Sequence, residues 1–163
     1  MRMKSLFLLL TITLASPLSA LADDALWIKQ TAHGMDCAPC AYSVEKALGQ
    51  LDGVSAVEVS LENGIATLSL TADAEPDMAE IRKIIKRSGF TPRAADVRLE
   101  GRLTSVNAER QLVVGEQRFT LEPTEAVPAG QLDAVLDTRL VITGRVPEDQ
   151  ATLIEVKGIQ RRE

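Results

Sequence analysis

The stretch that decides how this chain folds is HGMDCAPC, residues 33–40. It contains both cysteines and the single histidine of the 163-residue sequence. An apolar run precedes it and an amphipathic run, residues 42–51, follows it, so Cys37 and Cys40 are predicted on a strand-to-helix turn. Helix N-termini carry unpaired N–H groups that favour negative charge and lower thiol pKa values. The turn therefore predicts metal binding or thiol redox chemistry.

The segments around this turn alternate between strand and helix periodicity up to about residue 99. The predicted elements are a strand at 26–32, a helix that starts at Asp36 or Cys37 and runs to about 51, strands at 57–61 and 65–70 joined by an Asn63-Gly64 hairpin, a helix from Pro76 to Gly89 and an extended segment at 91–99. The order strand, helix, strand, strand, helix, strand predicts an α+β, ferredoxin-like domain.

Residues 34–40 carry the complete motif Gly-Met-x-Cys-x-x-Cys. Over about residues 25–98 the chain resembles the heavy-metal-associated domain family, which includes periplasmic mercury-binding carriers and the metal-binding domains of heavy-metal P-type ATPases. The resemblance implies a ferredoxin-like fold, a binding protein rather than an enzyme, and one heavy-metal ion held by the thiolates of Cys37 and Cys40. It also implies that Met35 packs into the core beneath the loop.

Asp36 departs from the threonine that the copper-carrier version of the motif has at this position. Two thiolates with Cu(I) carry one net negative charge, and a carboxylate would double it, whereas two thiolates with a divalent ion are neutral. Asp36 resembles the aspartate of zinc-, cadmium- and lead-exporting ATPase domains, so we predict it as a third metal ligand. Zinc, cadmium, lead or mercury are then favoured, and copper stays possible. The alternative is that Asp36 only caps the helix.

Four further residues near the motif have competing interpretations. His33 is either an exposed residue at a strand end or a fourth metal ligand. Phe90 matches the family's aromatic position that shields the thiolates, although packing alone would also explain it. Trp27 and Tyr42 are predicted as core or interface residues only.

The N-terminus predicts a signal peptide, residues 1–22. Arg2 and Lys4 are basic, residues 6–14 are apolar, and Ala20-Leu21-Ala22 is a small-x-small cleavage site. The apolar run is too short to span a bilayer comfortably, which disfavours an uncleaved anchor. We expect a periplasmic or secreted mature chain with no transmembrane segment.

The whole chain has a net charge of −5, and loss of the two basic signal residues would make it −7. No basic patch with interleaved aromatic residues is found, so nucleic acid is an unlikely partner. An acidic surface suits a cation carrier but is also an ordinary solubility feature.

From residue 97 onward the pattern becomes all-β. Short strands are predicted at 97–103, 112–114, 118–121, 138–146 and 152–159, with a helical turn at 131–136. Their spacing predicts a small β-barrel. This part of the chain resembles the small OB-like β domains of exported bacterial proteins. The predicted divisions are therefore 1–22, 23–96 and 97–163, although residues 97–103 also suit the end of the first sheet.

The leading functional prediction is an exported carrier that captures a heavy-metal ion and passes it on by ligand exchange, with a membrane metal transporter as a candidate partner. One alternative is a periplasmic thiol-disulfide oxidoreductase, which the compartment and the Cys-x-x-Cys pair allow. Against it, residues 25–98 lack the length and strand order of a thioredoxin fold. Another alternative is a metal-responsive adaptor whose barrel binds a second protein.

Overall fold

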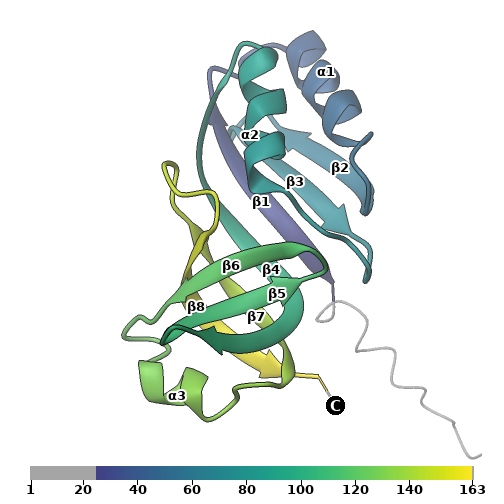
Figure 1. Cartoon of the computed structure of the whole chain (residues 1–163). Helices are drawn as coiled ribbons and strands as arrows, with labels where there is room; N and C mark the ends of the chain where they lie inside the picture. Colours follow the sequence, from purple (N-terminus) through teal and green to yellow (C-terminus); the bar gives the residue numbers. More distant parts are fainter. Residues whose placement is uncertain (1–24, 163) are drawn as a thin grey trace, which may run out of the picture.

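The computed structural model describes residues 25–162, so the predicted signal peptide lies outside the described residues. The elements in chain order are β1 (Leu26–His33), α1 (Ala38–Leu48), β2 (Val54–Ser60), β3 (Ile65–Leu70), α2 (Met78–Arg87), β4 (Thr91–Val106), β5 (Glu109–Val114), β6 (Gln117–Glu122), α3 (Ala129–Asp133), β7 (Arg139–Val146) and β8 (Leu153–Arg161). Figure 1 shows an upper part that carries α1 and α2 and a lower part made of strands with α3 at its base.

The upper part is the predicted ferredoxin-like arrangement. Its strands lie in the order β2-β3-β1-β4, and every neighbouring pair is antiparallel. Both helices cover the same face of this sheet (Figure 1). The α+β prediction is therefore confirmed, and the strand-to-helix turn with the two cysteines lies at the end of the sheet where β1 finishes.

Hydrogen bonds at the helix termini explain where α1 ends and where α2 begins. Helix α1 ends at Leu48, earlier than the predicted residue 51, because the amide of Gly49 closes the last turn on Glu45 O at 2.9 Å. Helix α2 begins after Asp77, whose carboxylate accepts hydrogen bonds from the first free amides of the helix.

The lower part is a closed, five-stranded mixed barrel with the strand order β4-β5-β6-β8-β7, closed by pairing of β7 with β4. Strands β6 and β8 run parallel, and all other neighbours are antiparallel. Helix α3 lies between β6 and β7 in the chain. This topology confirms the predicted OB-like barrel.

Strand β4 belongs to both parts. Its first half pairs with β1 from Thr91 to Arg98, and the stretch Ala95–Arg102 pairs with β7 on the opposite side. Residues 97–103 therefore both close the first sheet and open the barrel. The predicted boundary between residues 96 and 97 falls inside this continuous strand.

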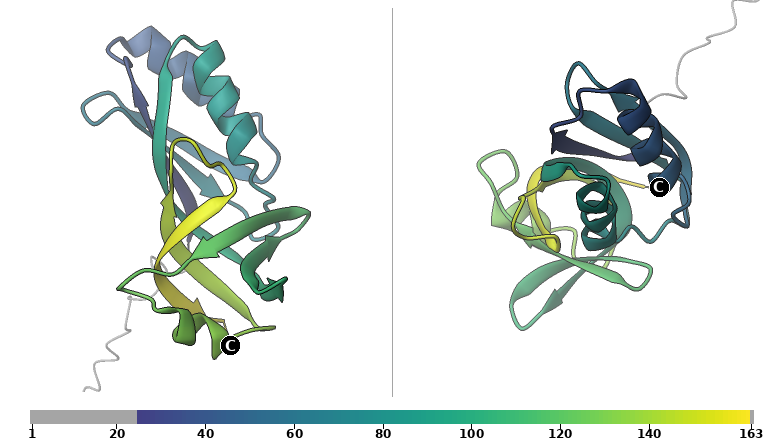
Figure 2. Two further views of the ribbon diagram at one scale, coloured as in Figure 1. Left: turned by 60° about the vertical axis from the view of Figure 1, so that its left-hand side comes forward. Right: turned by 90° about the horizontal axis from the view of Figure 1, so that it is seen from above.

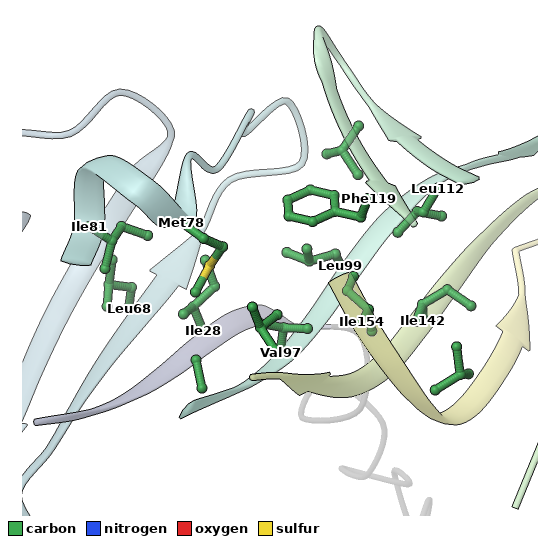
Figure 3. Close-up of a cluster of buried hydrophobic side chains, with 14 of the residues drawn as sticks. Ile28, Leu68, Met78, Ile81, Val97, Leu99, Leu112, Phe119, Ile142 and Ile154 are labelled. Carbon is green, nitrogen blue, oxygen red and sulfur yellow. The ribbon is translucent and has the colours of Figure 1, made fainter. Parts of the chain in front are cut away.

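One hydrophobic core runs through both parts. Met78, at the start of α2, lies between Ile28 and Leu68 of the upper sheet and Leu99 and Phe119 of the barrel (Figure 3). Seen from above, α2 stands over the ring of barrel strands (Figure 2). Among residues 25–162, no helix combines the length and apolarity needed to cross a bilayer.

Candidate metal centre

The loop between β1 and α1 lies at the end of the molecule that is farthest from α3 (Figure 1). We call Gly34–Cys37 the metal loop. It leaves β1 after His33 and delivers Cys37 to the N-cap position of α1, where φ is −130° and ψ is 137°. Cys40 follows in the first helical turn. The turn thus brings both predicted thiolate ligands to one helix N-terminus.

The two cysteines are covalently bonded to each other. Cys37 and Cys40 form a disulfide with a Cα–Cα distance of 5.3 Å. Cys37 Sγ also accepts a hydrogen bond from the amide of Cys40 at 3.3 Å, and the Cys37 carbonyl accepts from the amides of Cys40 and Ala41 at 3.1 Å each. A helix N-terminus stabilises a thiolate at this position once the disulfide is reduced. The described state is the oxidised one, in which the sulfurs cannot bind a metal ion.

The conformation of the loop depends on Gly34. Its φ is +92°, a left-handed backbone that a side chain would strain, and a Cβ at this position would lie 3.8 Å from Cδ1 of Phe90. The half-buried Phe90 therefore packs beside the loop. Met35 is 4% exposed and belongs to the hydrophobic core, which confirms its predicted packing role.

Asp36 does not cap the helix, because Cys37 occupies that position and its sulfur accepts the amide hydrogen bond. The Asp36 side chain is exposed next to the cysteine pair. No hydrogen bond or ion pair to its carboxylate is found within residues 25–162. The carboxylate is therefore not committed to a structural contact in this part of the chain.

His33 is exposed, as one of its two interpretations predicts. Its Nδ1 accepts a hydrogen bond from Arg93 Nε at 3.3 Å, so the lone pair of this nitrogen is not free to bind a metal ion. In the described part of the chain, no three side chains of His, Cys, Asp or Glu lie close enough together to hold a metal ion. The oxidised structure thus assembles the two cysteines without a third ligand.

Tyr42 was predicted as a core or interface residue, and the structure excludes the core alternative. It is 65% exposed on α1, whereas Ala41 and Val44 form the buried face of that helix. Trp27 is half-buried, and Lys29 Nζ lies 4.8 Å from the centre of its ring.

The sequence analysis did not predict a polar network that is centred on Arg82 and Gln30 and that reaches His33, beside the metal loop, through Arg93. The side chains of Arg82 and Gln30 are buried, with exposed fractions of 6% and 0%. A signal was present for Arg82, because it occupies a position on the apolar face of α2, between Ile81 and Ile85. A charged residue on such a face requires partners from elsewhere in the fold.

Comparisons with known proteins agree with this site. The profile of the heavy-metal-associated domain matches residues 31–91. The copper chaperone CopZ of Bacillus subtilis is 42% identical over 58 residues, which are 36% of this chain and 83% of CopZ. The chain therefore belongs to the heavy-metal-associated domain family, and its Cys-x-x-Cys pair at 37–40 is the heavy-metal-binding motif of that family.

Two ATPase relatives are named for different metals. The zinc/cadmium/lead-transporting P-type ATPase of Escherichia coli is 41% identical over 61 residues, or 37% of this chain. This chain spans only 8% of the length of that ATPase and of the copper-transporting ATPase 2 of Rhizobium meliloti. The structure of oxidized MerP from Ralstonia metallidurans CH34 shares 26% identity, with a TM-score of 0.37, over 42% of this chain and 93% of MerP. The relatives do not specify one ion.

Proposed function

We propose that this protein is an exported carrier of a soft or borderline divalent ion, held by Cys37 and Cys40 with Asp36 as a third ligand. The observation that carries the proposal is the placement of both sulfurs at the half-buried N-terminus of α1, at the end of the molecule away from α3. A site at this end is accessible to a second protein, as transfer of the ion requires.

The unpaired carboxylate of Asp36 supports a divalent ion. A capping role does not account for this residue, because Cys37 is the cap. Zinc and cadmium accept a carboxylate oxygen beside two thiolates, whereas Cu(I) prefers sulfur alone. The zinc/cadmium/lead-transporting relative supports the same choice, and the CopZ relative supports Cu(I) as the competing ion.

The chemistry follows from the dithiol form. A dithiol reductant that itself becomes a disulfide supplies the two electrons and two protons that turn the Cys37–Cys40 disulfide into two thiols, and binding of the ion then releases both thiol protons. A cysteine of a partner can then add to the ion before one of these thiolates leaves. A membrane metal transporter is the partner class that we propose for this exchange.

The test is a competition titration of the reduced chain with Zn(II), Cd(II), Hg(II) and Cu(I). We expect one ion per chain and a preference for a divalent ion over Cu(I), relative to a dithiol chelator of known affinity. A Cys37→Ser/Cys40→Ser variant is the matched control. Equal binding by this variant, or a preference for Cu(I), would contradict the proposal.

Export rests on the signal-like residues 1–22. We expect the mature chain to begin at Asp23 and to accumulate outside the cytoplasm. Cell fractionation followed by N-terminal sequencing measures both properties. A cytoplasmic chain that retains residue 1 would contradict export without affecting the metal site.

The Cys37–Cys40 disulfide favours a second candidate, a thiol-disulfide oxidoreductase. In that reaction the disulfide would accept two electrons from a substrate dithiol, which becomes a disulfide, while Cys37 and Cys40 become thiols. The assay is oxidation of a reduced test protein by the oxidised chain. A rate no higher than that of the Cys37→Ser/Cys40→Ser variant would exclude this candidate.

A further inference from the structure

Arg82 and Gln30 are the two buried polar side chains of residues 25–162. They come from the upper part, on α2 and β1, and Arg82 Nε donates to Gln30 Oε1 at 3.5 Å. A buried cation is costly unless all of its donors are paired. Most of the partners that Arg82 finds lie in the barrel.

The barrel supplies three carbonyl groups at the end of β7 and in the loop that leads to β8. Arg82 Nη2 donates to Pro147 O at 2.7 Å and to Val146 O at 3.2 Å, and Nη1 donates to Glu148 O at 3.1 Å. Burial lowers the pKa of Arg82, and the carboxylates of Asp149 and Glu148 act in the opposite direction. The β7–β8 loop thus provides both hydrogen-bond acceptors and compensating charge.

Gln30 carries the contact from Arg82 to an irregular point in the sheet. Register between β1 and β4 shifts between the pairs Gln30–Ala95 and Ala32–Pro92, which leaves one extra residue on β4. The Gln30 amide donates to Arg93 O at 2.7 Å and to Thr31 O at 2.8 Å. The bulge is therefore stabilised by a side chain that Arg82 holds in place.

The side chain of Arg93 completes the network at the surface. Its Nη1 lies 3.2 Å from Glu148 Oε2 in the β7–β8 loop, and its Nε donates to Nδ1 of His33. His33 is the last residue of β1 and directly precedes the metal loop. Buried and exposed contacts therefore both connect the barrel loop to the start of the metal loop.

We propose that the barrel positions the metal loop, with Arg82 and Arg93 as positioning residues that act through Gln30 and His33. Neither arginine has a contact with the cysteines. Weakening the network loosens the end of β1, from which the metal loop starts. The inference rests on the proposed function only for the metal ion that the loop would bind, because the positioning of the loop applies to the oxidised chain as well.

The experiment measures amide hydrogen exchange by NMR in the oxidised full chain. The reporters are Ala32, whose amide donates to Gly64 O at 2.8 Å, and Ala41, whose amide donates to Cys37 O. They flank the metal loop on either side and are distant in sequence from the barrel. The variants are Glu148→Gln, Arg93→Gln and Arg82→Met, and the matched control is Arg110→Gln, which breaks the Arg110–Asp133 pair elsewhere on the barrel.

We expect Glu148→Gln and Arg93→Gln to raise exchange at both reporters by up to about fivefold, as loss of an exposed ion pair allows. Arg82→Met should raise it by about tenfold or more, because it removes a buried side chain and its hydrogen bond to the buried Val146 carbonyl. The control should leave both reporters unchanged. If Arg82→Met fails to fold, the other two variants decide.

Faster exchange that is confined to residues 146–151, with unchanged Ala32 and Ala41, would overturn the positioning role. A second readout is the rate at which the reduced chain releases Zn(II) to a chelator, which should rise in the same order of variants. If the wild-type chain binds no metal in the titration, the proposed function fails, and hydrogen exchange still decides this inference.

Discussion

The metal loop and the junction between α2 and the barrel both bring polar side chains together, and they are built in opposite ways. In and beside the metal loop, Asp36 and His33 are exposed and the two cysteines are half-buried. At the junction, Arg82 and Gln30 are buried and their hydrogen bonds reach residues more than fifty positions away.

This difference separates function from stability. Apart from the buried Met35, the side chains of the metal loop and the neighbouring Cys40 are exposed or half-buried, so their replacement should change binding and leave the fold intact. The junction side chains are themselves buried and donate to backbone carbonyls, so their replacement should destabilise the fold and affect binding only through position. The following predictions test this separation, from the largest effect to the smallest.

The largest effect should come from the double substitution Cys37→Ser/Cys40→Ser. We expect complete loss of metal binding, because no other group of potential ligands is present within residues 25–162. The unfolding midpoint in reducing buffer should remain that of the wild type, because neither thiol then forms a covalent bond. Native mass spectrometry with metal and a thermal melt measure the two properties, and a large drop in the midpoint would break the separation.

Oxidation should have nearly the same effect on binding without any substitution. The Cys37–Cys40 disulfide occupies both sulfurs, so the oxidised chain should bind no ion until a reductant is added. Stoichiometry measured before and after treatment with a phosphine reductant gives the result. Full binding by the oxidised chain would place the site at other residues.

Arg82→Met should reverse the pattern. Its loss removes the hydrogen bonds from Arg82 to the carbonyls of Val146, Pro147 and Glu148, which should lower the free energy of unfolding by about 2 kcal/mol. Arg110→Gln, at an exposed pair, should cost far less. Denaturant melts of both variants measure the difference, and equal losses would show that the junction does not depend on its buried cation.

Asp36→Thr should give the smallest effect, and it should be selective. Affinity for Zn(II) or Cd(II) should fall about tenfold, equivalent to about 1.4 kcal/mol, while affinity for Cu(I) stays the same or rises. Stability should not change, because Cys37 is the helix cap. Parallel competition titrations and an apo melt are needed, and equal losses for both ions would remove Asp36 from the ligand set.

The sequence was sufficient to predict the ferredoxin-like part because each element carries a local signal. The motif at 34–40, the Asn63-Gly64 hairpin and the apolar periodicities of α1 and α2 depend on residues close to one another in the chain. The barrel was predicted from turn spacing alone, and its closure by β4 and β7 follows from pairs about forty to fifty residues apart. Such long-range pairs leave no local pattern.

The ligands of the candidate site could be predicted from the sequence, but the residues that position them could not. Cys37 and Cys40 are identified by the motif, whereas the cap could not be assigned between Asp36 and Cys37 until the backbone conformation was known. Arg82 could have been noticed on the apolar face of α2, but its partners in the β7–β8 loop lie more than sixty residues away. The core alternative for Tyr42 was wrong because α1 buries its smaller neighbours Ala41 and Val44 instead.

The continuous strand β4 has a consequence for the order of folding. Its pairing with β1 closes the upper sheet, but the outer edge of β4 finds its partner only in β7, which begins at Arg139. A chain that is shortened before this residue would carry an open strand edge, a template for pairing with other chains. We expect that a fragment of residues 25–106, which keeps all of β4 but lacks β7, aggregates, and that the two halves of the full chain unfold in one cooperative transition.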